Sequence, residues 1–298
     1  MLTGPTAVGK TELSLKLAKL LCSPIISADS RQIYKHMKIG TAAPNEEQLK
    51  QVRHYFVGEL ELDQYYSAAM YEAQVMALLE RLFLQNDYVL MTGGSMMYVD
   101  AVCNGIDDIP TVNSDVREMM LRQWKQKGAE YMVEQLKLMD PTYYEIVDKK
   151  NTKRVVHALE ICYMTGRPYS SFRTGKKKTR PFEIKKCALE RERQHLFDRI
   201  NRRVDAMMEN GMLDEARLLY NYRHLNSLNT VGYKEMFKVI EGEWNMDFAV
   251  ERLKKNTRVY AKKQMTWMQK DNDINWINLD ECNEEQALKK IMYLLGFK

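Results

Sequence analysis

The chain has 298 residues, of which 45% are hydrophobic and 29% charged, a composition typical of a globular protein of about two domains. It contains no run of roughly 18 apolar residues, and no basic segment followed by an apolar one opens it, so membrane insertion and secretion are not expected. The net charge of +5 is too small to indicate a partner by itself.

The first predicted element is a helix that follows a glycine-rich loop. The loop occupies residues 4–11, and apolar residues then recur at helical spacing from Leu13 to Leu21. A helix is therefore expected to begin near Lys10.

Very little chain precedes this loop. A phosphate-binding loop normally follows a complete buried strand, whereas only Met1, Leu2 and Thr3 come before it here. We expect the natural chain to start about 5 to 15 residues upstream of Met1. A sheet built on a short stub is the alternative, and the sequence leaves it open.

Two further apolar runs, at 24–28 and 88–91, have the length and composition of buried strands. Between them, 46–51 and 67–84 show helical patterns. This alternation of strand, helix and strand predicts an α/β fold with a parallel sheet.

From residue 113 onward the patterns become mostly helical. The predicted helices are 116–126, 131–139, 152–164, 194–222 and 248–270, with a strand at 182–189. We therefore expect a helical insertion at 113–171 within a P-loop NTPase-like core formed by 1–112 and 172–298.

The positions of the cysteines and charged residues indicate which compartment and which kinds of partner to expect. The five cysteines form no Cys-x-x-Cys pair and leave one over, which argues against a disulfide framework or a zinc site and indicates a reducing cytoplasm. Between Asn151 and Arg203 there are 15 Lys or Arg against 5 Asp or Glu, so this segment carries +10 and the rest of the chain −5. Such a segment indicates either a polyanion-binding surface or a solvated basic face.

The strongest motif is G-x-x-x-x-G-K-T in the first loop. Its predicted diphosphate-binding residues are Gly4, Pro5, Thr6, Ala7, Val8, Gly9, Lys10 and Thr11. Glycines let backbone N–H groups converge on phosphate oxygens, Lys10 reaches a terminal phosphate, and Thr11 is the candidate Mg²⁺ ligand. The loop indicates a diphosphate-containing ligand without distinguishing ATP or GTP from other diphosphates.

An acidic residue closes the second predicted strand. Asp29 directly follows 25–28, where it can hold Mg²⁺ or act on a nucleophile. The alternative is a turn or helix-capping role, which is common for Asp-Ser.

Nine motifs occur in an order that resembles one enzyme family. They are 4–11 (GPTAVGKT), 26–34 (ISADSRQIY), 39–44 (IGTAAP), 93–98 (GGSMMY), 151–160 (NTKRVVHALE), 165–168 (TGRP), 199–204 (RINRRV), 232–235 (GYKE) and 256–267 (NTRVYAKKQMTW). Together they resemble the bacterial tRNA dimethylallyltransferases, or tRNA isopentenyltransferases, over nearly the whole chain. The resemblance implies transfer of a dimethylallyl group from dimethylallyl diphosphate to N6 of adenosine 37 in tRNA, giving N6-(dimethylallyl)adenosine and diphosphate.

The resemblance also implies catalytic roles. Asp29 corresponds to the general base on N6, while Lys10, Arg203 and Mg²⁺ stabilise the departing diphosphate. Ser95 replaces the family's threonine and retains its hydroxyl. From the residues alone, Arg199 and Arg203 are also compatible with a solvated or salt-bridged helix face.

The residues that the resemblance places on the tRNA anticodon stem-loop come from four segments. They are Asp29, Ser30, Arg31, Gln32, Lys153, Arg154, His157, Gly232, Tyr233, Lys234, Arg258, Lys262 and Lys263, with Gln264 beside them. The amide of Gln32 has the groups needed to pair with an adenine edge. His157 stands where the family has arginine, and a packed helix histidine is the alternative there.

Three alternatives remain open at this level. A P-loop kinase for small metabolites or nucleotides would use the same loop for ATP, a prenyltransferase acting on free AMP would share the chemistry, and an RNA-binding protein would keep the loop as a vestige. The run Lys176-Lys177-Lys178-Thr179-Arg180 matches no motif and is expected to be a solvated loop. We expect a monomer.

Overall fold

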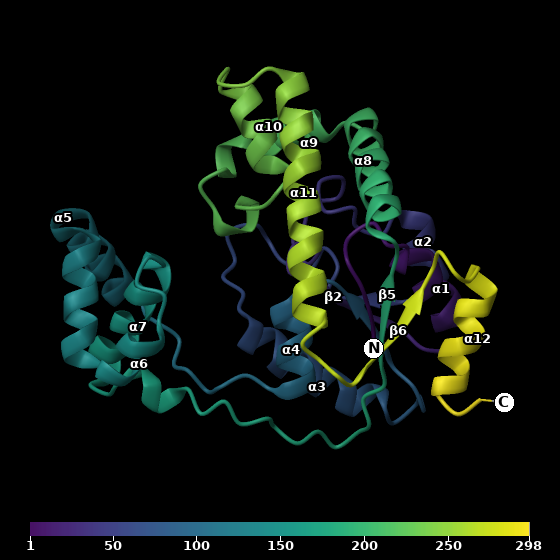
Figure 1. The fold of residues 1–298 in the computed structure, drawn as a ribbon, viewed down its shortest axis with the longest axis horizontal. Helices are drawn as coiled ribbons and strands as arrows, with labels where there is room; N and C mark the ends of the chain where they lie inside the picture. Colours follow the sequence, from purple (N-terminus) through teal and green to yellow (C-terminus); the bar gives the residue numbers. More distant parts are fainter. Residues whose placement is uncertain (298) are drawn as a thin grey trace. The chain divides into compact units, whose positions relative to one another are not determined.

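The computed structural model describes residues 1–297 and divides the chain into two compact units. The first combines 1–103 with the C-terminal part from Arg180, and the second is Asn104–Thr179 (Figure 1). The second unit is longer at both ends than the predicted insertion, because its two connecting segments bond to each other. The amide of Lys178 donates to the carbonyl of Asn104 at 2.7 Å, and that of Thr174 to the Asp107 carboxylate at 3.0 Å.

The first unit is built on a six-stranded sheet in the order β3-β2-β4-β1-β5-β6, and every pairing is parallel. The strands are β1 (Leu2–Thr3), β2 (Ile25–Ala28), β3 (His54–Tyr55), β4 (Leu90–Gly93), β5 (Lys186–Glu190) and β6 (Ile274–Asn278). The predicted parallel α/β fold is therefore confirmed. Although β1 has only two residues, it lies between β4 and β5, with Leu2 opposite both Thr92 and Cys187.

Helices cover the sheet and extend beyond it (Figure 1). In the first unit they are α1 (Lys10–Leu20), α2 (Glu46–Gln51), α3 (Ala68–Leu82), α4 (Met96–Asn104), α8 (Arg193–Glu209), α9 (Met212–Leu219), α10 (Tyr233–Ile240), α11 (Met246–Met268) and α12 (Glu284–Leu294). Leu13 of α1 and Ile291 of α12 pack in one buried cluster with Ile25, Leu90 and Leu189 of the sheet. Burial of these apolar side chains fixes the start of α1, and hence the phosphate loop, against the strands.

Helices α8 to α11 pack on one another as a group. The prediction of one continuous helix at 194–222 is wrong. The helix breaks at Gly211, whose φ of 92° is left-handed, so that α8 ends before this residue and α9 begins after it. The predicted helix at 248–270 is confirmed as α11. The C-terminal end of α11 packs on the sheet through Met268, which contacts Ala188 and Ile274.

The second unit is helical, as predicted. It contains α5 (Ser114–Met139), α6 (Pro141–Ile146), α7 (Thr152–Thr165) and the 3₁₀ helix η1 (Tyr169–Phe172). Gly128, with φ 80° and ψ 176°, interrupts α5 between the two segments expected to be separate helices. Asp140 is fully buried and accepts hydrogen bonds from the amides of Tyr143 and Ser170, which joins α6 to η1. Among the described residues no helix is long and apolar enough to cross a bilayer.

Candidate active site

The phosphate loop connects β1 to α1 at the carboxyl edge of the sheet. Gly4 and Gly9 have φ of 150° and 122°, and a Cβ on Gly4 would lie 2.8 Å from the carbonyl oxygen of Leu189. Only glycine fits at this close approach. Gly9 caps α1 without any side-chain hydrogen bond, so the first amides of α1 remain open to an anion.

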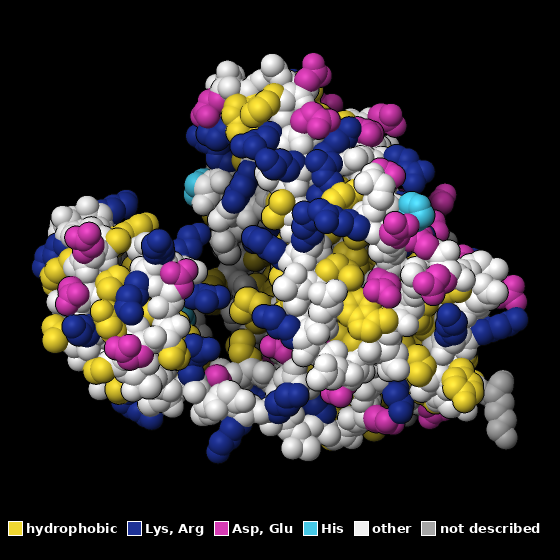
Figure 2. Space-filling model, viewed as in Figure 1, with side chains coloured by type: hydrophobic (Ala, Val, Ile, Leu, Met, Phe, Trp, Pro, Cys, Tyr) yellow, Lys and Arg dark blue, Asp and Glu magenta, His cyan; other side chains and the backbone are white. Residues whose placement is uncertain are grey.

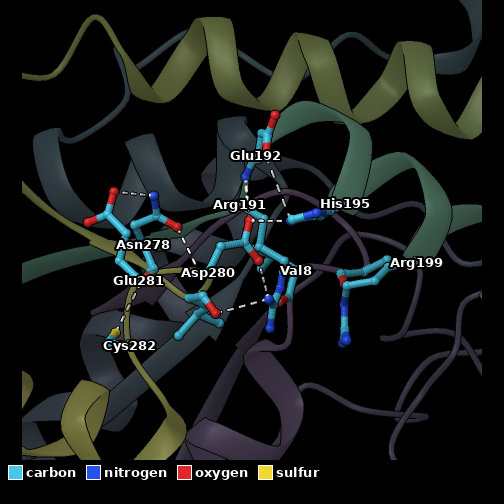
Figure 3. Close-up of polar contacts among 11 residues, drawn as sticks. Val8, Arg191, Glu192, His195, Arg199, Asn278, Asp280, Glu281 and Cys282 are labelled. Atoms are coloured by element: carbon cyan, nitrogen blue, oxygen red, sulfur yellow. Dashed lines mark hydrogen bonds and ion pairs between the residues drawn. The ribbon is translucent and has the colours of Figure 1, made fainter.

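Two arginines, Arg191 and Arg199, lie beside this loop (Figure 3). Arg199 Nε donates to the carbonyl of Ala7 at 2.8 Å, and Arg191 Nε donates to that of Val8 at 3.0 Å. Arg191 is fixed in turn by Asp280 at 2.7 Å. These contacts hold two loop carbonyls in place, and they could not be predicted from the sequence because each arginine is more than 180 residues from its loop partner.

Asp280 is the centre of that supporting network. It also accepts from the amide of Glu192 at 2.6 Å, and His195 Nδ1 lies 3.1 Å from it (Figure 3). Burial acts to raise the pKa of Asp280, but these hydrogen bonds outweigh it and hold the pKa below its usual value. The carboxylate therefore stays charged and keeps Arg191 in place.

Lys10 and Arg203 bring two cations to the ligand side of the loop. Lys10 Nζ donates to the carbonyls of Gly4 at 2.9 Å and Pro5 at 2.8 Å. Burial, followed by the charge of Arg203, lowers the pKa of Lys10 to about 7, and Asp29 acts in the opposite direction. Such a shift is typical of a lysine in a site that binds an anion.

Arg203 is half-buried and lines the cavity, and it forms no ion pair with another described residue, so it does not belong to a salt-bridged helix face. Burial lowers its pKa, and Asp29 counteracts this. Among the described residues no carboxylate or carbonyl accepts a hydrogen bond from its guanidinium. A half-buried cation without a protein partner carries a desolvation cost unless a ligand supplies the counter-charge.

Asp29 and Ser95 lie at the ends of neighbouring strands β2 and β4. Asp29 Oδ1 accepts from the amides of Arg31 at 2.8 Å and Gln32 at 3.2 Å, which is the turn role considered from the sequence. Its Oδ2 has no hydrogen bond among the described residues. The Ser95 hydroxyl accepts from the amide of Ser30 at 2.8 Å, so the two strand ends are linked.

These groups surround one cavity of about 800 Å³ in the first unit. Its lining includes the phosphate loop, Asp29, Ser95 and Arg203, together with Tyr260 and Gln264 of α11. Cations, a carboxylate and a hydroxyl therefore converge on one space, as required for a reaction in which an anion leaves and a proton is removed.

Part of the 29–32 segment has a structural role. Arg31 Nη1 donates to the carbonyls of Asn226 and Ser227, at 2.9 and 3.2 Å. The side-chain Nε2 of Gln32 donates to the carbonyls of Thr41 and Ala42, at 3.2 and 3.1 Å. Gln32 thereby supports the 41–42 loop, and because it also lines the cavity its contact with the target adenine stays a prediction.

Tyr233 was expected on the tRNA side but is fully buried. Its hydroxyl donates to Glu215 at 2.6 Å, and the same carboxylate accepts from the amides of Lys38, Ile39 and Gly40. The side chain of Tyr233 is thus a packing group that holds the 38–40 loop. Gly232 is also buried, whereas Lys234 is exposed and lines the cavity.

The predicted basic face of α11 is present. Arg258 and Lys262 lie 6.0 and 5.5 Å from the ring of Phe197, and Arg193 lies 5.3 Å from it. Lys263 is exposed next to them. Figure 2 shows Lys and Arg side chains gathered over the helices that include α10 and α11, as expected of a surface for a polyanion.

In the second unit, Lys153 and Arg154 are exposed on α7. His157 Nδ1 lies 3.3 Å from Glu160, and the ring meets Tyr169 edge-on at 5.8 Å. The histidine is therefore held within its own unit, in agreement with the packing alternative.

The basic run 176–180 is not wholly a solvated loop. Arg180 is buried, with an ion pair to Glu72 at 2.7 Å and a hydrogen bond from Nε to the carbonyl of Val102 at 2.8 Å. The expectation is corrected for this residue, which anchors the chain where it re-enters the first unit.

Known proteins resemble this chain over most of its length. The family model for IPP transferase matches residues 32–271. The chain belongs to the IPP transferase family. A protein named tRNA dimethylallyltransferase 1 from Bacteroides fragilis is 60% identical over 95% of this chain and 94% of its own length. A protein of the same name from Phocaeicola vulgatus is also 60% identical, over 95% of both chains.

Solved structures agree with this IPP transferase assignment. The tRNA isopentenylpyrophosphate transferase of Bacillus halodurans superposes with a TM-score of 0.71 at 32% identity, covering 99% of this chain and 94% of that one. A eukaryotic dimethylallyltransferase shares the fold, with a TM-score of 0.84 at 23% identity. The range matched to the IPP transferase model includes Ser95, Arg203 and α11, while the phosphate loop precedes it.

Proposed function

We propose that this chain transfers the dimethylallyl group of dimethylallyl diphosphate to N6 of adenosine 37 in tRNA. One observation carries the proposal: the unpartnered guanidinium of Arg203 and the ammonium of Lys10 face the same cavity as the free oxygen of Asp29. The names of relatives at 60% identity support the same reaction. A kinase would use the loop for ATP, and nothing in the lining favours that reading over the proposed one.

In the proposed reaction, N6 of the adenine attacks C1 of the dimethylallyl group. The N6–C1 bond forms while the C1–O bond breaks, and the electron pair of that bond leaves with the diphosphate. Asp29 accepts the proton that N6 loses. The exocyclic amine is a poor nucleophile because its lone pair is conjugated with the ring, so the site has to supply both a base and a stabilised leaving group.

Charge on the departing diphosphate is stabilised by groups that are already in place. The loop amides and the two cations face it, and each well-aimed donor of this kind contributes about 3 kcal/mol. The Ser95 hydroxyl accepts from the amide of Ser30 and donates to the Ser30 hydroxyl at 3.1 Å, and we propose that it turns to donate to a diphosphate oxygen when the substrate binds. Because Arg203 has no protein partner, the diphosphate also relieves the cost of its burial.

Magnesium fits the residues near the loop. Thr11 and Thr92 both line the cavity, and the buried hydroxyl of Thr92 has no hydrogen-bond partner. Hydroxyl, carboxylate and diphosphate oxygens are the ligands that Mg²⁺ prefers. We propose that Thr11 holds Mg²⁺ together with the diphosphate, where the ion supplies further charge neutralisation. The described residues contain no cluster of three or more His, Cys, Asp or Glu that suits a metal ion.

The anticodon stem-loop is the proposed partner of the basic face on α11 and of Lys153 and Arg154. Cationic side chains on helices bind nucleic-acid phosphates without reading sequence, so these residues would orient the tRNA. We propose that one chain acts as a monomer in the cytoplasm. Light scattering of the chain with and without tRNA tests the monomer.

The reaction itself is tested with Mg²⁺, dimethylallyl diphosphate and unmodified tRNA. We expect release of diphosphate and a heavier adenosine at position 37 by mass spectrometry. Parallel reactions with AMP as acceptor and with ATP as donor separate the alternatives. Prenylated AMP without modified tRNA, or phosphate transfer from ATP, would overturn the proposal.

A further inference from the structure

Gln264 lies where α11 meets two loops of the cavity. Its side chain is 3% exposed. Nε2 donates to the carbonyl of Gly94 at 2.8 Å, while Oε1 accepts from the amide of Thr6 at 2.9 Å. Thr6 belongs to the phosphate loop and Gly94 directly precedes Ser95, so one buried amide joins both loops.

The contact at Gly94 is tight. A Cβ on Gly94 would lie 2.3 Å from Gln264 Nε2 and 3.5 Å from the carbonyl oxygen of Gly4. Any side chain at this position would push the amide away. The close approach of Gly94 and Gln264 therefore depends on glycine.

The same helix supports the second loop at another point. Tyr260 lies one turn before Gln264 with its hydroxyl near Ser95, which acts to lower its pKa, although burial still raises the pKa of Tyr260 to about 12. Helix α11 thus bonds to both loops through Gln264, and Tyr260 lies beside Ser95 in the second loop.

We propose that Gln264 is a positioning residue for the transfer reaction. By bonding to the phosphate loop and to the loop that contains Ser95, Gln264 fixes the distance between the two loops. The amides of the phosphate loop and the Ser95 hydroxyl can then bind the same diphosphate. The sequence indicated a tRNA-facing role for this residue, but its burial and both hydrogen bonds direct it to the diphosphate site. The inference rests on the proposed function.

Gln264→Met tests this by keeping the volume and removing both hydrogen bonds. A misplacement of about 1 Å costs up to roughly 10²-fold in rate, so we expect kcat to fall about 10- to 100-fold. KM for dimethylallyl diphosphate should rise, while tRNA affinity stays at the parental value. Gln269→Met is the matched control, because Gln269 is exposed at the end of α11 and bonds to neither loop.

Gln264→Glu gives a signature that a packing role would not produce. A carboxylate accepts from the Thr6 amide but cannot donate to the Gly94 carbonyl, whereas the protonated acid does both. The rate of this variant divided by the parental rate should therefore rise as the pH falls from 8 to 6. This ratio decides the question even if Gln264→Met unfolds.

Gly94→Ala provides an independent measurement. It should slow transfer in the parental enzyme because the new methyl displaces Gln264, and it should cost little more in a Gln264→Ala background, where the space is free. Parental kcat and KM in folded Gln264→Met, or a pH-independent rate ratio for Gln264→Glu, would overturn the inference. If the parental enzyme itself makes no prenylated tRNA, it is the proposed function that fails.

Discussion

Charged residues in the cavity carry most of the chemistry, and their protein partners are few. Lys10 is held only by two carbonyls of its own loop, and Arg203 has no partner among the described residues. The residue types were predictable, because the loop motif places Lys10 and the end of a buried strand places Asp29. The contacts around these residue types were not predictable. The sequence placed Gln32 and Tyr233 on the tRNA, whereas their protein partners, Thr41 and Glu215, are known only from the fold.

The role of Asp29 is tested by Asp29→Asn. The asparagine oxygen can still accept from the amides of Arg31 and Gln32, so the turn and the fold should persist. Without a base, transfer should slow by roughly 10² to 10⁴, measured as tRNA prenylation at saturating substrates. Asp214→Asn, on the exposed surface of α9, is the control. An unchanged rate would reduce Asp29 to its turn role.

Lys10 predicts a pH dependence. Its pKa of about 7 in the folded protein is below the value of 10.5 for an exposed lysine, so folding disfavours the charged form. The cost to stability is complete below pH 7 and disappears as the pH rises toward 10.5. Lys10→Met should therefore raise the melting temperature most at pH 6 and progressively less at pH 8 and 9, in thermal melts without ligand.

The same shift affects binding. Diphosphate affinity of the parental protein should fall as the pH rises above 7, because Lys10 loses its charge. Lys10→Arg, whose guanidinium stays charged, should lack this component of the decline. Identical pH profiles for the two proteins in titration calorimetry would contradict the assignment of Lys10.

At the scale of elements, local sequence patterns predict most helices and strands, and the predictions fail where tertiary contacts determine whether an element forms. Strand β6 was not predicted, because its five residues do not alternate and it becomes a strand only by pairing with β5. Helix α12 had a readable signal in the capping box of Asn283 and Gln286. The break at Gly211 was missed because the apolar pattern continues across it.

The basic face of α11 predicts a salt dependence. If Lys262 and Lys263 bind tRNA phosphates, replacing both by alanine should reduce the log–log salt slope of tRNA affinity by about one to two units. The rate at saturating tRNA should stay close to parental. Lys289→Ala with Lys290→Ala, an equally exposed pair on α12, is the matched control. A parental slope with a lost kcat would assign these lysines to the catalytic core.

At the scale of the whole molecule, the two units have separate cores. The helical unit buries its own cluster, which includes Met132, Leu136, Leu159 and Ile161. Its connecting segments meet where Lys178 bonds to Asn104. The sequence indicated the insertion but not these segments, since extended chain has no periodicity to mark it.

Excision of the helical unit is therefore expected to leave a folded remainder. Joining Asn104 to Lys178 through a short Gly-Ser linker should preserve diphosphate binding, because the cavity is lined only by the first unit. Affinity for tRNA should fall, since Lys153 and Arg154 are lost. Thermal melts and calorimetry with dimethylallyl diphosphate check the first outcome, and filter binding checks the second. Loss of diphosphate binding in a folded variant would contradict the separation.

The two-residue strand β1 has a consequence for how the site arises during synthesis. Leu2 pairs with Thr92 and Cys187, and Gln264 supports the loop that follows. In the chain, the phosphate loop precedes these supports by about 90, 185 and 260 residues, so they are synthesised after it. Contacts so distant in sequence form slowly. A nascent chain should therefore remain unable to bind diphosphate until α11 has emerged, so ligand binding would report that α11 has docked on the phosphate loop.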